Sequence, residues 1–195
     1  MGTDKTGPVS APPAAGFGEV LNVAVRREAE KLVVREARAG ELDEVAVLTE
    51  HSFEEYWPLV PPAFAEAAQR DLADVRGRLG SGELLVAELG GRLVGTVTFL
   101  PDGGGYPAPG WPPAWCAVRL LAVDPASRRL GVGRRLGIEC LDRARRRGAA
   151  AIGLHTAPFM ASARRVYESL GFKRVPALDI ETSGAPPALA YRLNL

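Results

Sequence analysis

The stretch Leu120–Leu136, LLAVDPASRRLGVGRRL, decides the fold of this chain. An apolar run that we predict to be a strand stops at Pro125, and Gly131-Val132-Gly133 then leads into a predicted helix. A helix that begins directly after a strand presents backbone N–H groups with no partner inside the helix. These groups and the positive end of the helix dipole attract anions, so the stretch predicts an anion site.

The residue types around this turn favour phosphate as the anion. Glycine at positions 131 and 133 lacks the Cβ atom that would keep a phosphate away from the backbone. Four arginines flank the turn, namely Arg128, Arg129, Arg134 and Arg135. Because a guanidinium group can hold two phosphate oxygens at once, we expect a ligand that carries a pyrophosphate.

Two other phosphate-binding motifs fit the stretch less well. A dinucleotide-binding fingerprint needs a third glycine where this chain has Leu136. A P-loop needs Gly-Lys followed by Ser or Thr, and the chain lacks that sequence. The alternative that Gly131 and Gly133 only build a tight turn stays open from residue type alone.

The composition narrows the class of protein. At 195 residues the chain is long enough for one well-buried domain and too short for two ordinary ones. The formal net charge of +1 gives no general field for nucleic acid or an anionic membrane. The longest basic run, Arg143–Arg147, is interrupted by Ala144 and is typical of the solvated face of a helix. We therefore expect neither a nucleic-acid nor a membrane partner.

The two cysteines, Cys116 and Cys140, lack the spaced Cys or His partners of a zinc site, so we expect buried free thiols and no metal. No apolar stretch approaches the roughly 20 residues needed to span a bilayer, and the chain does not begin with a charged segment followed by an apolar one. These features favour a cytoplasmic location. The first 18 residues mix Gly, Pro, Ser and Ala without periodicity. We predict a flexible extension over residues 1–30 and a folded domain over residues 31–195.

Apolar periodicity and turn residues divide the domain into strands and helices. Strands are predicted over residues 32–37, 83–89, 92–100, 115–123, 149–156, 172–175 and 188–193. Helices are predicted over residues 41–49, 63–79, 131–147 and 161–170. Gly90-Gly91 predicts a tight hairpin between the second and third strands. The order of elements predicts an α/β (α+β) fold, with helices packed on a mixed sheet.

Three features of the sequence resemble the GNAT superfamily of N-acetyltransferases: the strand ending in LLAVDP, the turn Arg128–Gly133, and Ala163–Phe172, ARRVYESLGF. The resemblance covers roughly residues 32–195. It implies the GNAT fold, a mixed, mostly antiparallel sheet of about seven strands with helices on both faces and splayed central strands. It also implies that a primary amine of a small molecule or peptide attacks the thioester of acetyl-CoA directly.

The resemblance implies where acetyl-CoA binds. Backbone groups of Leu121, Ala122 and Val123 would pair with the pantetheine arm as an added strand would. The pyrophosphate would lie on the amides that follow, which belong to Leu130, Gly131, Val132, Gly133, Arg134 and Arg135.

The resemblance also implies how protons move. Tyr167 matches the family's tyrosine acid, which protonates the CoA thiolate, although a tyrosine at this position could also simply pack the last helix on the sheet. Some relatives carry a glutamate on the fourth strand, whereas Ala117–Arg119 contains no carboxylate. His155, at the predicted end of the fifth strand, is our candidate for relaying the proton of the amine. Weaker candidates are His51, Glu54 and Glu55. A second departure is Met160, where many members have an asparagine, and Thr156 could replace its contact.

Aromatic residues mark the implied acceptor pocket. Phe53, Tyr56 and Trp57 lie between the first helices, and we predict that they bind the acceptor. The loop before the fourth strand adds Tyr106, Trp111 and Trp115. Such residues favour a partly apolar acceptor, or one with an aromatic or cationic group, unless they only seal the loops onto the core. Three alternatives stay open. The enzyme could prefer another acyl-CoA, the chain could be a CoA-binding regulatory module without turnover, and it could assemble as a homodimer.

Overall fold

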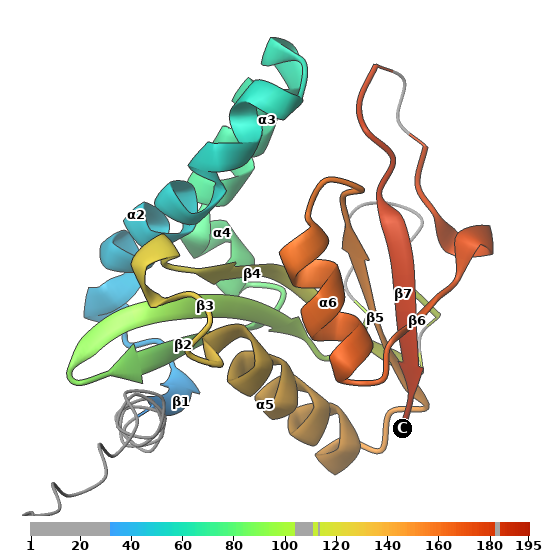
Figure 1. The fold of residues 1–195 in the computed structure, drawn as a ribbon. Helices are drawn as coiled ribbons and strands as arrows, with labels where there is room; N and C mark the ends of the chain where they lie inside the picture. The colour runs from blue at the N-terminus through green and yellow to red at the C-terminus, as the bar shows by residue number, and fades with distance from the viewer. Residues whose placement is uncertain (1–31, 104–110, 113, 182–183) are drawn as a thin grey trace, which may run out of the picture.

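The structure is a computed structural model, and it describes residues 32–103, 111–112, 114–181 and 184–195. The predicted extension over residues 1–30 and Tyr106 lie outside the described residues. One seven-stranded sheet has the order β1-β2-β3-β4-β5-β7-β6 (Figure 1). Its strands are β1 (Leu32–Glu36), β2 (Glu83–Leu89), β3 (Arg92–Leu100), β4 (Trp115–Val123), β5 (Ala151–Thr156), β6 (Lys173–Arg174) and β7 (Leu189–Asn194). Neighbouring strands are antiparallel except β4 and β5, which are parallel.

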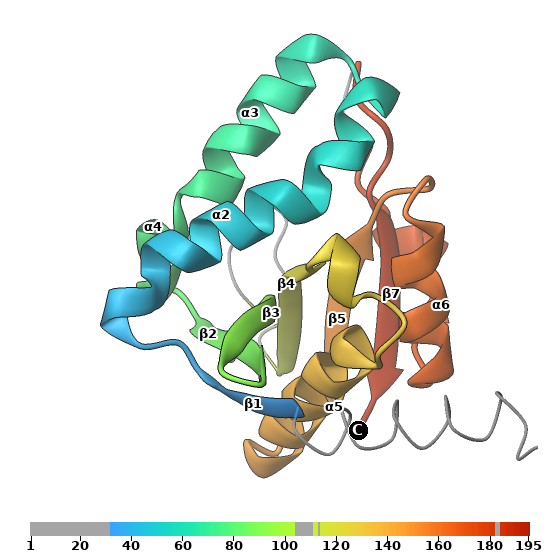
Figure 2. The same cartoon turned by 60° about the vertical axis from the view of Figure 1, so that its left-hand side comes forward.

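Helices cover both faces of this sheet (Figures 1 and 2). One face carries α2 (Leu42–Phe53), α3 (Pro62–Ala73) and α4 (Val75–Leu79), and the other carries α5 (Val132–Arg146) and α6 (Ala161–Ser169). Short 3-10 turns complete the chain as η1 (Ala39–Glu41), η2 (Glu54–Leu59), η3 (Pro125–Ser127) and η4 (Pro176–Leu178). The predicted fold class is therefore confirmed.

The alternation of side chains along β2 shows why the sheet needs two helical layers. Leu84 and Val86 pack with α2 in one core cluster, whereas Leu85 and Ala87 pack with α5 in the other. Successive residues of a strand point to opposite faces, so a strand of this kind must be covered on both sides. Burial of these apolar side chains is the main force that holds both helical layers on the sheet.

A bulge interrupts β4 at its centre. The pairing register between β3 and β4 shifts between Thr96 and Thr98, so that Leu120 and Leu121 together oppose one residue of β3. Leu120 has a φ of 51°, a conformation that residues with a Cβ seldom adopt. The bulge bends β4 just before the turn that precedes α5.

The two central strands separate beyond this point. Pairing between β4 and β5 ends at Val118 and Leu154, although β4 continues to Val123 and β5 continues to Thr156. The edge of β4 that faces β5 therefore has no neighbouring strand over residues 119–123. This separation is the splayed arrangement that the resemblance implies.

The structure corrects the helix predicted over residues 63–79, which is two helices. The chain breaks at Asp74, which has a ψ of 61° and whose carboxylate accepts a hydrogen bond from the Gly77 amide at 2.9 Å. A Cβ at Gly77 would lie 2.1 Å from that carboxylate, so glycine leaves room for the cap of α4. The predicted hairpin is confirmed, since Gly90 and Gly91 both have positive φ. The helix predicted over residues 41–49 continues to Phe53, and the other predicted bounds are within two residues.

Candidate active site

The N-terminus of α5 presents backbone amides beside the end of β4. Gly131 precedes the helix with a φ of 82°, which glycine adopts without strain. The first helical hydrogen bond runs from the Arg135 amide to the Gly131 carbonyl at 2.9 Å. Within the described residues, the amides of Val132 and Gly133 have no backbone or side-chain acceptor. They are therefore available to an anion at the positive end of the helix dipole.

Packing within the chain does not explain the glycine at position 133. A Cβ added there would meet Leu121 and Val123 at 3.5 Å, which is ordinary van der Waals contact. The backbone at Gly133 has no positive φ that would demand glycine. An added methyl group would lie against these two side chains of β4, next to the unpaired amides.

The four arginines of the turn have different surroundings. Arg129, Arg134 and Arg135 are exposed. Arg128 places its Nη1 atom 2.6 Å from a carboxylate oxygen of Glu55, and its Nη2 atom donates to the Ser52 carbonyl at 3.2 Å. Arg128 therefore connects the end of α2 and η2 to the turn, and it could bind a phosphate only if this ion pair opened.

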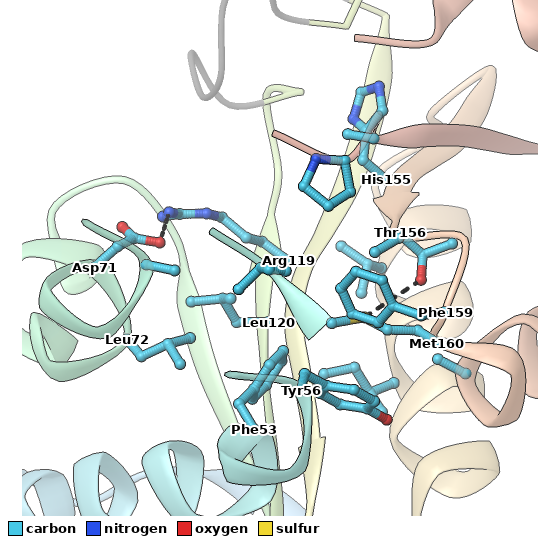
Figure 3. Close-up of a pocket in the computed structure, with 18 of the residues that line it drawn as sticks. Phe53, Tyr56, Asp71, Leu72, Arg119, Leu120, His155, Thr156, Phe159 and Met160 are labelled. Atoms are coloured by element: carbon cyan, nitrogen blue, oxygen red, sulfur yellow. Dashed lines mark hydrogen bonds and ion pairs between the residues drawn. The ribbon is translucent and has the colours of Figure 1, made fainter. Parts of the chain in front are cut away.

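A cavity of about 270 Å³ lies where β4 and β5 separate (Figure 3). Its walls come from the middle of β4, the end of β5 with the start of α6, and the segment from η2 through α3. Most of its lining is apolar or aromatic. The structure brings six predicted site residues together here, namely Phe53, Tyr56, Trp57, Leu121, His155 and Tyr167. Ala122 and Val123 follow along β4 without lining the cavity.

Tyr167 lies on α6 and lines the cavity. Its side chain packs edge-on against Phe172, with ring centroids 6.0 Å apart. Burial raises the pKa of its phenol well above the usual value, so the group is protonated at neutral pH. Tyr167 is therefore a core residue whose phenol keeps its proton at neutral pH.

His155 lies at the end of β5, under the indole ring of Trp111. The two rings are stacked with centroids 4.5 Å apart, and Nε2 of His155 lies 3.0 Å from the Leu178 carbonyl oxygen. Burial is the largest cause that lowers the pKa of this imidazole, and the carbonyl and Asp179 oppose it. The neutral imidazole that results can accept a proton inside the cavity.

The remaining aromatic residues divide between the cavity and the core. Trp111 lines the cavity and lies against Gly153, where a Cβ would approach the indole to 2.7 Å. Trp115 stacks on Trp111 at 5.6 Å and lies beneath the guanidinium of Arg192 at 5.3 Å, outside the cavity. Trp115 therefore seals the end of the sheet, as the alternative interpretation of these aromatics states.

An ion pair that the sequence analysis missed lies on the α3 side of the cavity. The carboxylate of Asp71 on α3 accepts a short hydrogen bond from Nη2 of Arg119 on β4, and both residues line the cavity (Figure 3). The sequence held one signal for this pair. Arg119 interrupts the otherwise apolar strand WCAVRLLAV, and a half-buried arginine needs an anionic partner. The segment Ala117–Arg119 of β4 contains no carboxylate, but the carboxylate of Asp71 on α3 lies directly opposite it.

The weaker base candidates lie elsewhere. His51 pairs with Glu54 on an exposed surface at 3.2 Å, Glu55 pairs with Arg128, and none of the three lines the cavity. Thr156 donates to the sulfur of Met160 at 3.7 Å. No group of three His, Cys, Asp or Glu residues within the described ranges could hold a metal ion. No described helix is long and apolar enough to cross a membrane.

Comparison with known proteins decides the family. The profile of the Acetyltransferase (GNAT) family matches residues 33–172, which include the turn before α5, the cavity walls and Tyr167. The chain belongs to the GNAT acetyltransferase family. The family that the sequence motifs resemble is therefore confirmed.

One curated relative and many solved structures are similar to this GNAT protein. A mycothiol acetyltransferase from Thermomonospora curvata is 33% identical over 135 residues, which cover 64% of this chain and 41% of the relative. The chain thus matches less than half the length of that protein. The PaiA N-acetyltransferase of Thermoplasma acidophilum has a TM-score of 0.65 at 13% identity, covering 84% of this chain and 99% of its own. A GNAT acetyltransferase of Brucella melitensis has a TM-score of 0.57 at 22% identity, covering 84% and 88%.

Proposed function

We propose that this GNAT protein transfers the acetyl group of acetyl-CoA to a primary amine of a small molecule or a peptide, by direct attack of the amine on the thioester. The Thermoplasma structure is described as a complex with coenzyme A and the Brucella structure as a complex with acetyl-CoA. Both share the fold of this chain, which supports the same cosubstrate here.

Three features of this chain fit acetyl-CoA. The unpaired amides at the start of α5 suit a pyrophosphate. The edge of β4 from Arg119 to Val123 lacks a neighbouring strand and can pair with an extended pantetheine arm. The cavity begins where this edge leaves β5, so the acetyl end of the cosubstrate would lie there.

His155 acts on the amine side of the reaction. Alkyl amines have pKa values of about 10 and are mostly protonated near neutral pH, so a group must take up a proton before or during attack. The neutral imidazole of His155 accepts it, because the bond from Nε2 to the Leu178 carbonyl leaves the lone pair on Nδ1.

Tyr167 acts on the sulfur side. Bound acetyl-CoA supplies a thioester, and collapse of the tetrahedral intermediate gives a thiolate that must be protonated. The phenol of Tyr167 is protonated at neutral pH and can donate to the sulfur. The observation that carries the proposal is this pairing of a neutral imidazole and a protonated phenol on one cavity at the splayed strands.

The second candidate function is a CoA-binding regulatory module without turnover, which the absence of a carboxylate within Ala117–Arg119 favours. Two measurements separate the candidates. Thermal unfolding with and without acetyl-CoA tests binding, and release of free thiol across a panel of amines tests turnover. The panel includes amines related to mycothiol, since the Thermomonospora relative carries that name. Stabilisation with thiol release supports the enzyme, stabilisation alone supports the module, and no stabilisation contradicts both.

A further inference from the structure

Arg128 lies on the turn before α5, but its guanidinium group contacts the segment at the end of α2. Its Nη1 atom lies 2.6 Å from a carboxylate oxygen of Glu55, and its Nη2 atom donates to the Ser52 carbonyl at 3.2 Å. That carbonyl lies in the last turn of α2, where a cation is favourable. Both terminal nitrogens of Arg128 are therefore engaged with the chain that leads from α2 into η2.

The turn that carries Arg128 is anchored by its own hydrogen bonds. The Asp124 amide donates to the Val94 carbonyl of β3 at 3.0 Å. The Asp124 carboxylate accepts from the Ala126 amide at 3.3 Å and from the hydroxyl of the buried Ser127 at 3.0 Å. Arg128 thus extends from a fixed part of the sheet and can hold a neighbouring segment in place.

The segment that Arg128 contacts has little burial of its own. Every residue of η2 is at least partly exposed to solvent. Tyr56 and Trp57 of η2 nevertheless line the cavity, together with Phe53 of α2. We call these three residues the aromatic wall. Because burial contributes little to holding η2, the polar contacts with Arg128 contribute a larger share.

The spacing along the chain separates the contacts with Arg128 from the wall. Residues three apart lie on one side of a helical turn, so Ser52 and Glu55 share one side and Phe53 and Tyr56 share the next. The rings of Phe53 and Tyr56 lie side by side at the cavity, with centroids 6.0 Å apart (Figure 3). Burial raises the pKa of the Tyr56 phenol, and its hydrogen bond with Glu55 raises it further. Glu55 therefore links Arg128 to a residue of the wall.

We propose that Arg128 is a positioning residue for the acceptor, and that its contacts with Ser52 and Glu55 hold the aromatic wall where the apolar part of an acceptor amine binds. Arg128 thus serves the acceptor and not the pyrophosphate, although it belongs to the turn before α5. Acceptors with an aromatic group depend on it, because their rings pack on the wall. This inference rests on the proposed acetyl transfer.

The test compares phenethylamine with ethylamine, which lacks the ring. For phenethylamine, Glu55→Gln and Arg128→Gln should each raise KM about fivefold or more, while kcat and the Kd of acetyl-CoA stay within about twofold of the wild type. For ethylamine, kcat/KM should stay within about twofold, since this amine does not reach the wall. The double variant should lose no more than Arg128→Gln alone, because both changes remove the same contact.

Glu54→Gln is the matched control, because it makes the same change of charge at the neighbouring position. Glu54 pairs with His51 at 3.2 Å on an exposed surface and does not line the cavity, so the KM for phenethylamine should not change. Arg134→Gln provides the opposite contrast. Arg134 is exposed beside the unpaired amides of α5, so its loss should weaken acetyl-CoA binding and leave the KM for phenethylamine unchanged. Melting temperatures confirm that each variant is folded.

The inference is wrong if Glu55→Gln or Arg128→Gln keeps the wild-type KM for phenethylamine. Weaker acetyl-CoA binding in Arg128→Gln with an unchanged KM for the amine would make Arg128 a phosphate ligand instead. The inference is also wrong if ethylamine loses as much as phenethylamine, because the effect would then not involve the aromatic wall.

Failure of the proposed function has a different signature. If the wild type releases no thiol with phenethylamine, calorimetric titration of phenethylamine into the CoA-loaded protein replaces turnover. Weaker binding to Glu55→Gln than to the wild type and Glu54→Gln would then support positioning by Arg128 without acetyl transfer. Equal affinities in the three proteins, or no binding to the wild type, would overturn the inference.

Discussion

The Nε2 atom of His155 lies 3.0 Å from the carbonyl oxygen of Leu178. Because a carbonyl oxygen only accepts hydrogen bonds, Nε2 carries the proton of the neutral ring and Nδ1 carries the lone pair. The segment that holds Leu178 is itself fixed, since Asp179 accepts from both terminal nitrogens of Arg174 and from the Ala190 amide, each at 2.8 Å. Hydrogen bonds from Arg174 in β6 and Ala190 in β7 thus hold the segment whose carbonyl group selects the tautomer of His155.

The pH dependence of turnover tests the role of His155. Burial lowers its pKa below the ordinary 6.5, so the ring stays neutral and able to accept a proton until the pH falls below that value. We expect kcat/KM to decline on the acid side only below pH 6.5. His155→Gln should lose about 10²-fold in kcat/KM and should lack this acid limb.

The second histidine of the chain provides the control for this measurement. His51 is exposed and pairs with Glu54 outside the cavity, so His51→Gln should keep both the rate and the acid limb. An unchanged limb in His155→Gln would remove His155 from the reaction.

Tyr167→Phe separates proton donation from packing. The variant keeps the ring that packs edge-on against Phe172 but removes the phenol, so we expect kcat to fall about 10²-fold with little change in acetyl-CoA affinity. Tyr191→Phe is the control, because the Tyr191 phenol donates a hydrogen bond to the Glu168 carboxylate at 3.1 Å and Tyr191 does not line the cavity. Rapid-quench kinetics and calorimetric titration report the two quantities, and a Tyr167→Phe enzyme with the wild-type rate would exclude the assigned role.

The Arg35–Glu41 pair gives a prediction about stability. Arg35 donates to both carboxylate oxygens of Glu41 at 2.8 and 2.7 Å, and these bonds, with the Arg38 amide, lower the pKa of Glu41 from 4.5 to about 2. A lowered carboxylate pKa stabilises the fold above 4.5, and that contribution is lost as the pH falls from 4.5 toward 2.

Glu41→Gln should therefore reduce the free energy of unfolding by about 1–2 kcal/mol at neutral pH. Its difference from the wild type should shrink when urea unfolding is measured at pH values below 4.5. Asp43→Asn, which removes an exposed ion pair, should change the free energy by less than about 0.5 kcal/mol. A difference between Glu41→Gln and the wild type that does not depend on pH would contradict this account.

Local signals predicted most of the fold. The Gly90-Gly91 hairpin and the start of α5 depend on backbone conformations that only a few residue types adopt easily, so sequence specifies them directly. The break at Asp74 was missed because Val75 and Leu79 continue the apolar spacing of α3. The capping bond from Asp74 to Gly77 overrides that periodicity.

The candidate site could be predicted where a family motif, a strand end or a cluster of aromatic residues marked it. Tyr167 and the turn before α5 have such a motif, whereas Asp71 is one of many charged residues on a helix. Its partner Arg119 lies 48 positions away, and only the crossing of α3 over β4 brings them together. The orientation of His155 likewise depends on Leu178, in a segment whose sequence gives no sign of that contact.

Gly131 and Gly133 make opposite predictions although they are two positions apart. Gly131 needs its positive φ of 82°, so Gly131→Ala should lower the free energy of unfolding by about 1–2 kcal/mol. Gly133 has an ordinary helical backbone and room for a Cβ, so Gly133→Ala should raise it by up to about 1 kcal/mol. The same methyl group would lie against Leu121 and Val123, on the residue that carries one of the unpaired amides of α5, and we expect acetyl-CoA affinity to fall about tenfold or more. S-acetylpantetheine has no pyrophosphate, so the rate of acetyl transfer from it should be the same in Gly133→Ala and in the wild type.

Gly40→Ala is the control for an added methyl group, because a Cβ at that site would have nothing within 4 Å. A Gly133→Ala protein that binds acetyl-CoA as tightly as the wild type would show that the glycine serves the turn and not the ligand.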